Sequence, residues 1–243
     1  MKTLFIGDIH GRNVWKQIYE NNKPDKMIFV GDYFDSFNIS SNDQINNFLD
    51  IIELKKSSGI DVVMLIGNHD YHYMPYTQEY YSGHQKIHHF IIQNTLLDNI
   101  EHLSMCHRVD NFLITHAGIS FKWLSYWYKK LYNKNLLDYE SIEKIVNDIW
   151  EHTPRAFKFT GMDPYGDSEE SSPIWIRPKS LQRSNKDYLK NYYVQIVGHT
   201  QHNKIDIEGK TTGGKYYYID TLETSGEYLI LEDGKLTVNN LLK

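Results

Sequence analysis

Residues 3–11 read TLFIGDIHG, a short apolar run that ends in a glycine and an aspartate. The chain repeats this design twice within its first third, so that three apolar runs end in Gly7-Asp8, Gly31-Asp32 and Gly67-Asn68. Amphipathic helical stretches separate the runs, at residues 14–21 and 45–56. Alternation of this kind predicts an α/β fold with a largely parallel sheet.

Two further apolar runs extend the pattern beyond residue 110. Phe112–Thr115 leads to His116, and Val194–Val197 leads to Gly198-His199. In α/β sheets, ligands bind outside the carboxyl ends of the strands. Five strand ends are therefore expected to deliver polar groups to one region.

The rest of the chain is predicted to cover this core. Residues 121–132 and 139–152 have the periodicity of helices, and residues 153–172 have the composition of a long surface loop. After Lys204 we expect a meander of short strands, at 216–219, 228–232 and 236–242. No segment has the composition of a linker, so we expect one domain over residues 1–243.

The composition disfavours several classes of protein. A net charge of −5 lacks the basic excess that binds an extended nucleic-acid backbone. No apolar stretch is long enough for a membrane span, and Gly7-Asp8 interrupts the first run too early for an export signal. The single Cys106 cannot form an intramolecular disulfide, which favours a reducing, cytoplasmic location. The oligomeric state is left open.

The residues at the strand ends have the chemistry of a metal site. Singly, each is more often a turn or a cap, but together they offer carboxylate, amide and imidazole donors: Asp8, His10, Asp32, Asn68, His116 and His199. The set suits two divalent ions, Mn²⁺ first, with Fe, Zn²⁺ or Ni²⁺ as alternatives. Asp32 is the candidate bridge, because a carboxylate can bind one cation with each oxygen. Paired metals would lower the pKa of a bound water towards about 7.

A proton donor for the leaving group is the remaining requirement of phosphoester hydrolysis. His69 follows the candidate ligand Asn68 and is placed for this role. Asp70 could hold the His69 ring and raise its pKa by opposite charge. The competing interpretation of His69 and Asp70 is a surface turn.

Taken in order, these segments resemble the signature motifs of the calcineurin-like metallophosphoesterase superfamily: Gly7-Asp8-Ile9-His10-Gly11, Gly31-Asp32-Tyr33-Phe34-Asp35, Gly67-Asn68-His69-Asp70, Thr115-His116-Ala117-Gly118 and Gly198-His199-Thr200. Gly11 and the single histidine of the last motif are closest to the phosphoprotein phosphatase branch, which includes bacterial serine/threonine phosphatases and diadenosine tetraphosphatases. The resemblance implies a four-layer fold with a central β-sandwich flanked by helices. It also implies one metal on Asp8, His10 and Asp32, and a second on Asp32, Asn68, His116 and His199.

The chain departs from that branch where phosphate should bind. The branch usually has Arg-Gly after the second aspartate of its second motif, and here Ser36 follows Asp35. A guanidinium binds two phosphate oxygens at once, which a serine cannot do. Residues 175–177 resemble a later segment that supplies another phosphate-binding arginine. Arg177 is therefore the candidate anion contact, with Arg12 as a second.

The leading hypothesis is a phosphomonoesterase in which metal-bound hydroxide attacks a phosphoprotein, a nucleotide or a small phosphate. The alternative enzyme is a phosphodiesterase or a dinucleoside polyphosphate hydrolase. A non-catalytic binding scaffold on the same fold is disfavoured, because all six ligands and His69 are present. The tyrosines at 71–81 could line the mouth of the cleft, and the aromatic cluster at 123–128 is expected in the core.

Overall fold

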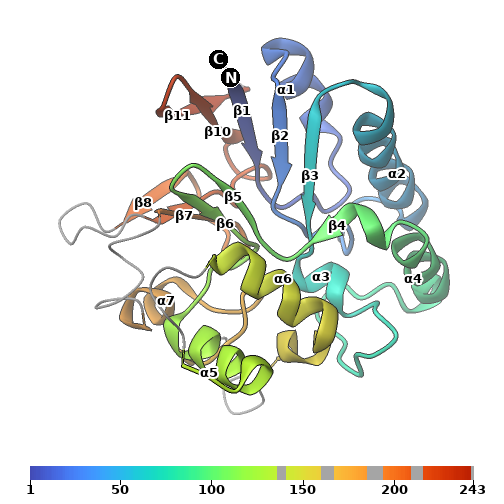
Figure 1. Cartoon of the computed structure of the whole chain (residues 1–243). Helices are drawn as coiled ribbons and strands as arrows, with labels where there is room; N and C mark the ends of the chain where they lie inside the picture. The colour runs from blue at the N-terminus through green and yellow to red at the C-terminus, as the bar shows by residue number, and fades with distance from the viewer. Residues whose placement is uncertain (136–140, 160–166, 185–193, 209–215, 242–243) are drawn as a thin grey trace.

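The apolar runs form strands in two mixed sheets (Figure 1). The computed structural model describes residues 1–135, 141–159, 167–184, 194–208 and 216–241. The first sheet has the order β11-β10-β1-β2-β3-β4. Its parallel strands are β1 (Lys2–Ile6), β2 (Lys26–Phe29), β3 (Asp61–Leu65) and β4 (Leu103–Ser104). Two antiparallel strands complete it, β10 (Glu227–Glu232) and β11 (Lys235–Asn240).

The second sheet has the order β5-β6-β7-β9-β8. Its strands are β5 (His107–Val109), β6 (Phe112–Ile114), β7 (Val194–Val197), β8 (Asp206–Glu208) and β9 (Tyr216–Tyr218). β6, β7 and β9 are parallel, and the two edge strands are antiparallel. The expected C-terminal meander is thus wrong in its pairing, because β9 lies against β7 in this sheet while β10 and β11 belong to the first.

The predicted helices are present, with others between them. The described helices are α1 (Val14–Asn22), α2 (Ser41–Ser57), α3 (Asn68–Tyr71), η1 (Lys86–His88), α4 (His89–Leu97), η2 (Ile100–His102), α5 (Phe121–Tyr132), α6 (Ile142–His152), η3 (Pro154–Phe157) and α7 (Pro178–Ser184). α6 begins where Ser141 caps it, and residues 139 and 140 lie outside the described residues. The predicted loop at 153–172 opens with η3, and its residues 160–166 also lie outside the described part, as does residue 242.

The two sheets pack face to face and helices cover their outer faces. Phe5, Ile28 and Leu65 of the first sheet share one buried cluster with Ile114 and Ile196 of the second. Leu4, Ile6 and Phe29 point to the opposite face and pack with Trp15 of α1 and Phe48 of α2. Strands that are buried on both faces are expected to be apolar, as these are beyond Lys2 and Thr3 of β1, Lys26 of β2 and Asp61 of β3.

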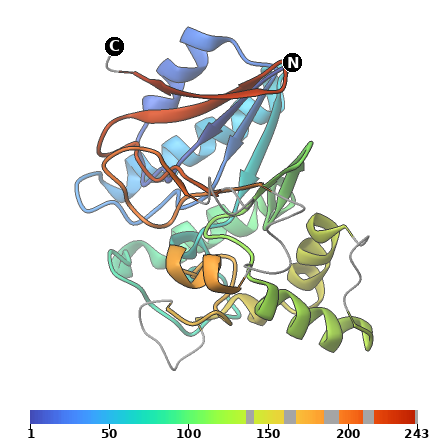
Figure 2. The same ribbon diagram turned by 90° about the vertical axis from the view of Figure 1, so that its left-hand side faces the viewer.

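The remaining helices close the other side of the molecule. Leu181 of α7 packs on Val197 and Tyr218 of the second sheet. In both views α5, α6 and α7 lie at the end farthest from the two termini (Figure 1 and Figure 2). Trp123 and Tyr128 of α5 are buried as predicted, whereas Tyr126 is exposed. The four-layer α/β fold is confirmed. Among the described residues, no helix combines the length and apolar character that a membrane span needs.

Candidate active site

The strand ends converge on one cavity of about 360 Å³, which we call the metal-side cavity. Asp8 follows β1, Asp32 follows β2 and Asn68 follows β3, while His199 arrives from β7 in the other sheet. His116, which follows β6, lies behind them and is fully buried. The site therefore lies where the carboxyl ends of strands from both sheets meet.

The backbone is locally strained at this point. Four non-glycine residues of the strand-end loops have positive φ angles, namely His10 (41°), Asp32 (53°), Asp35 (66°) and His199 (65°). Such conformations cost free energy, and they cluster at functional sites where the surrounding structure imposes them. The glycines of the motifs make room for the carboxylates. A Cβ on Gly67 would lie 2.1 Å from Asp32 Oδ1, and one on Gly198 would lie 1.9 Å from Asp8 Oδ1.

Main-chain carbonyls determine which nitrogen of each histidine faces the site. His116 Nδ1 lies 2.9 Å from the carbonyl oxygen of Val30, and His199 Nε2 lies 3.2 Å from that of Trp175. A carbonyl can only accept, so these nitrogens carry the protons. The lone pairs of the opposite nitrogens then point inward, where each lies 2.9 Å from Asn68 Oδ1.

When both imidazoles are neutral, this arrangement brings acceptors together without a proton between them. A cation between Asn68 Oδ1 and the two imidazole nitrogens would turn the repulsion into coordination. Two ligand atoms that each lie about 2.1 Å from one ion, at right angles, are about 3 Å apart. The observed separations thus fit a transition-metal site. His10 has the same design, with Nδ1 2.6 Å from the carbonyl oxygen of Phe34 and Nε2 3.7 Å from Asp32 Oδ2.

The carboxylates add negative charge that a cation would neutralise. Ligand atoms of Asp8, Asp32 and His116 all lie within 4.8 Å of one another. Burial, with Asp220 and Asp32 nearby, raises the pKa of Asp8 well above its ordinary value. Burial opposes ionisation of Asp32, but positive charge on His116 and His69 outweighs it and lowers the Asp32 pKa. Asp32 in turn outweighs the effect of burial on His116 and raises its pKa, so a proton takes the place of a cation on the inner nitrogen of His116. Oxygen and imidazole donors of this kind suit Mn²⁺, Fe or Zn²⁺. We call Asp8, His10, Asp32, Asn68, His116 and His199 the metal cluster.

His69 lies on the wall of the same cavity and is held by Asp35. His69 Nδ1 lies 2.9 Å from Asp35 Oδ2. Burial lowers the His69 pKa, but Asp32 and the hydrogen bond to Asp35 outweigh it and raise the pKa to about 9. His69 is therefore a protonated imidazole at neutral pH that can donate from Nε2.

The expected contact between Asp70 and the His69 ring is not found, and Asp35 holds the ring instead. Asp70 turns away because α3 points its carboxylate back at its own N-terminus. Its oxygens accept hydrogen bonds from the main-chain N–H groups of Asp32 (2.8 Å), Tyr33 (2.8 Å) and Gly67 (2.9 Å). Asp70 thus joins two of the strand-end loops, and only its expected effect through charge remains, since Asp70 contributes to the raised pKa of His69.

The two candidate arginines are placed differently. Arg177 lines the cavity, where Nη1 donates to the carbonyl oxygen of His199 (3.3 Å) and to Thr200 Oγ1 (3.1 Å). Arg12 lies on an adjoining cavity of about 450 Å³ and pairs with Glu223 at 2.7 Å.

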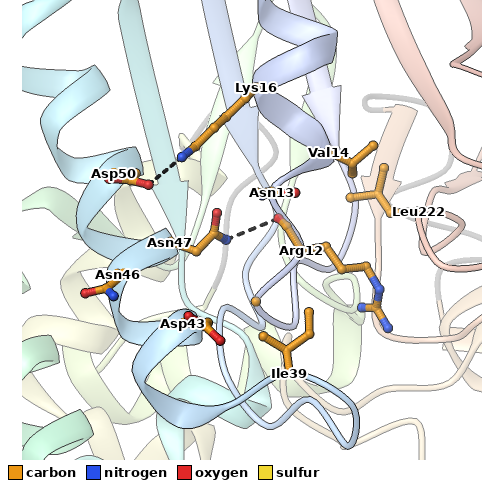
Figure 3. A pocket seen from close by; sticks show the side chains of 11 residues that line it. Arg12, Asn13, Val14, Lys16, Ile39, Asp43, Asn46, Asn47, Asp50 and Leu222 are labelled. Carbon is orange, nitrogen blue, oxygen red and sulfur yellow. Dashed lines mark hydrogen bonds and ion pairs between the residues drawn. The ribbon is translucent and has the colours of Figure 1, made fainter.

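A third cavity, of about 570 Å³, is lined by Arg12, Lys16 and residues of α2 (Figure 3). Lys16 pairs there with Asp50 at 2.5 Å, and Asn47 donates to the Arg12 carbonyl oxygen at 3.1 Å. Both of its cations, Arg12 and Lys16, are paired with carboxylates, which disfavours phosphate binding in this larger cavity.

Sequence reasoning missed Asp220, which lines the metal-side cavity and its neighbour. Burial and the charge of Asp32 raise the Asp220 pKa to about 6. Asp220 follows the apolar run at 216–219, so it is a sixth strand end, without the glycine that marked most of the others. Among the tyrosines expected at the cleft, Tyr81 lines it, whereas Tyr71 and Tyr73 are buried behind it.

Several solved structures share this fold. A cold-active protein-tyrosine phosphatase from a psychrophilic Shewanella is 18% identical with a TM-score of 0.61, over 99% of this chain and 80% of that chain. A protein serine/threonine phosphatase from Saccharomyces cerevisiae is 13% identical with a TM-score of 0.58, over 98% and 79%. A metallophosphoesterase from Sphaerobacter thermophilus is 14% identical with a TM-score of 0.53, over 99% and 88%. At these identities the likeness is one of fold.

Comparison with family models goes further than fold. A search of curated proteins found no match. The model of the calcineurin-like phosphoesterases matches residues 1–203, a span that holds all five of the predicted strand ends. The chain belongs to the calcineurin-like phosphoesterase family and is a metal-dependent phosphoester hydrolase.

Proposed function

We propose that the protein is a two-metal phosphomonoesterase. One ion is assigned to Asp8, His10 and Asp32, and the other to Asp32, Asn68, His116 and His199. The inward lone pairs and buried carboxylates of these residues support the assignment. When bound, such ions supply Lewis acidity and a nucleophile at neutral pH. Mn²⁺ is the first metal to test.

The observation that carries the proposal is the His69–Asp35 pair on the wall of the metal-side cavity. The leaving group of a phosphomonoester departs as an alkoxide or phenoxide, and its oxygen needs a proton. Asp35 fixes the proton on His69 Nδ1 and leaves Nε2–H for the leaving oxygen. Arg177, which lines the same cavity, is proposed to bind the non-bridging phosphate oxygens.

The substrate class follows from the same groups. A proton donor and one arginine beside two metal sites suit a dianionic phosphate on a protein, a nucleotide or a small molecule. We further propose that residues 1–243 form one domain, because β10 near the C-terminal end pairs with β1 at the other end.

The test is turnover of p-nitrophenyl phosphate and of its bis-ester, after chelation and with Mn²⁺ added back. We expect Mn²⁺ to restore monoester hydrolysis, and His69→Asn to lower turnover of phenyl phosphate, whose leaving group needs the proton, by about two to four orders of magnitude. Diester turnover that equals or exceeds monoester turnover would favour the phosphodiesterase instead. No turnover with Mn²⁺, Fe, Zn²⁺ or Ni²⁺ would contradict the proposal.

A further inference from the structure

Asp35 is bonded to more than His69. Its side chain is buried, and three groups converge on the carboxylate. His69 Nδ1 and His72 Nε2 lie 2.9 Å and 2.6 Å from Oδ2, and the Tyr73 hydroxyl lies 2.5 Å from Oδ1. We call Asp35, His69, His72 and Tyr73 the Asp35 cluster.

The proton positions in this cluster are fixed from outside it. His72 Nδ1 accepts the main-chain N–H of Tyr81 at 3.1 Å, so the proton of a neutral His72 is on Nε2, which faces Asp35. The Tyr73 hydroxyl accepts the main-chain N–H of Gln85 at 2.9 Å, so its own proton points to Asp35. A carboxylate offers about four lone-pair directions. His69 and Tyr73 take two of them, and His72 Nε2 lies at ion-pair distance from Oδ2 without the geometry of a hydrogen bond.

The local structure explains why these residues meet. His69, His72 and Tyr73 lie at positions i, i+3 and i+4 of the turn that begins with α3, and residues with this spacing share one face. Tyr71 lies on a different face, where its hydroxyl donates to the carbonyl oxygen of Pro154 at 3.0 Å. The motif that identified His69 ends at Asp70, so His72 and Tyr73 lie outside it.

We infer that His72 and Tyr73 are positioning residues for phosphoester hydrolysis: they hold the Asp35 carboxylate so that His69 keeps its Nε2–H directed at the leaving oxygen. This inference rests on the proposed role of His69 as proton donor. Neither His72 nor Tyr73 lines the metal-side cavity, so they act through Asp35.

The same two residues also support one wall of the cleft. Tyr81 and Ser82 line the metal-side cavity, and the main-chain bonds from Tyr81 and Gln85 tie their loop to His72 and Tyr73. The His72 ring stacks on the Tyr81 ring at 4.9 Å. A structural role of this kind would affect every substrate alike, so the test must separate it from positioning of the donor.

The leaving group provides that separation. Dinitrophenolate leaves without a proton, whereas phenolate needs one. In Tyr73→Phe, which keeps the ring, we expect kcat for phenyl phosphate to fall about tenfold to a hundredfold and kcat for dinitrophenyl phosphate to stay within about threefold. His72→Phe should behave alike, and His72→Gln, which keeps an N–H donor, should retain more activity. Tyr71→Phe is the matched control and should show no selectivity.

A double-mutant cycle then tests whether Tyr73 acts through His69. In a His69→Asn background, Tyr73→Phe should have no further effect on phenyl phosphate, because the group that it positions is gone. The inference is overturned if His69→Asn is selective but Tyr73→Phe lowers both esters equally, or if its effect persists in that background. If His69→Asn itself lowers both esters equally, the proposed role of His69 fails as well.

Discussion

The metal cluster and the Asp35 cluster are both built on histidines and aspartates, and they differ in where the protons of the histidines lie. In the metal cluster, main-chain carbonyls bind the outer nitrogens of His116 and His199, so that lone pairs point inward. In the Asp35 cluster, a main-chain N–H binds the outer nitrogen of His72, so that a proton points inward. The backbone partner thus decides whether a buried imidazole is suited to bind a metal or to donate a hydrogen bond.

The same difference in protons distinguishes two groups of residues that are equally close together and could each be taken for a metal site. Asp35, His69 and His72 offer ligand atoms as close together as those of Asp8, Asp32 and His116. The first group is already supplied with donors, since Asp35 also receives the Tyr73 hydroxyl at 2.5 Å. Only the second, with its unshared lone pairs and excess of carboxylates, calls for a cation.

Replacing Asp32, the proposed bridging carboxylate, should have the largest effect. We expect Asp32→Asn to lower kcat/KM for p-nitrophenyl phosphate by about three orders of magnitude or more, because it removes the proposed shared ligand of both ions. Thermal unfolding gives an independent readout. Mn²⁺ should raise the unfolding midpoint of the wild type, because binding at a hundredfold excess over Kd adds about 2.7 kcal/mol to the free energy of unfolding. Asp32→Asn should lose this shift and Asp35→Asn should keep it.

Replacing Asp35 should affect the proton donor and spare the metals. His69 must be protonated to act, and although burial lowers its pKa, the charges of Asp32 and Asp35 raise it. Activity should therefore be present below this pKa and be lost as pH rises through it. Asp35→Asn removes one of the charges that raise the His69 pKa, so the falling limb should move to lower pH. We also expect a loss of about two to three orders of magnitude in kcat. An unmoved limb would show that Asp35 does not set the His69 pKa.

Asp70 joins the loops that carry both clusters, so its loss should appear as instability. Asp70→Ala leaves three main-chain N–H groups without their acceptor and should cost about 2 to 3 kcal/mol in the free energy of unfolding. Urea denaturation measures this cost. The control is Asp61→Ala, which removes an exposed partner of Lys26 and should cost less than about 1 kcal/mol. Equal costs for the two variants would contradict the role of Asp70 in joining the two loops.

The sequence was sufficient where one rule repeats. A run of β-forming residues followed by glycine and a ligand fixes both the strand and the position of the side chain, and Asp8, Asp32 and Asn68 all lie where that rule puts them. The glycines themselves have a local reason, because Gly67 and Gly198 leave room for the carboxylates.

The contacts across the chain could not be predicted in this way. Asp35 and Asp70 are each the last residue of a motif, and only the three-dimensional path of α3 decides that Asp35 reaches His69 while Asp70 reaches main-chain N–H groups. The pairing of β9 and β10 failed for a similar reason, since adjacent strands in the chain joined different sheets. Asp220 was overlooked because its strand end lacks the glycine.

The smallest expected effect concerns Asp220, which adds a buried negative charge beside the metal cluster without belonging to the proposed ligand set. It contributes to the raised pKa of Asp8, so it increases the need for a cation there. We expect Asp220→Asn to raise the Mn²⁺ concentration for half-maximal activity by roughly tenfold while kcat at saturating Mn²⁺ changes little. Glu223→Gln is the control, since this carboxylate is 45% exposed and its ion pair with Arg12 should matter less than about twofold. If Asp220→Asn lowers kcat at saturating Mn²⁺ instead, Asp220 acts on the substrate, and the imbalance of charge in the metal cluster is carried by Asp8 and Asp32 alone.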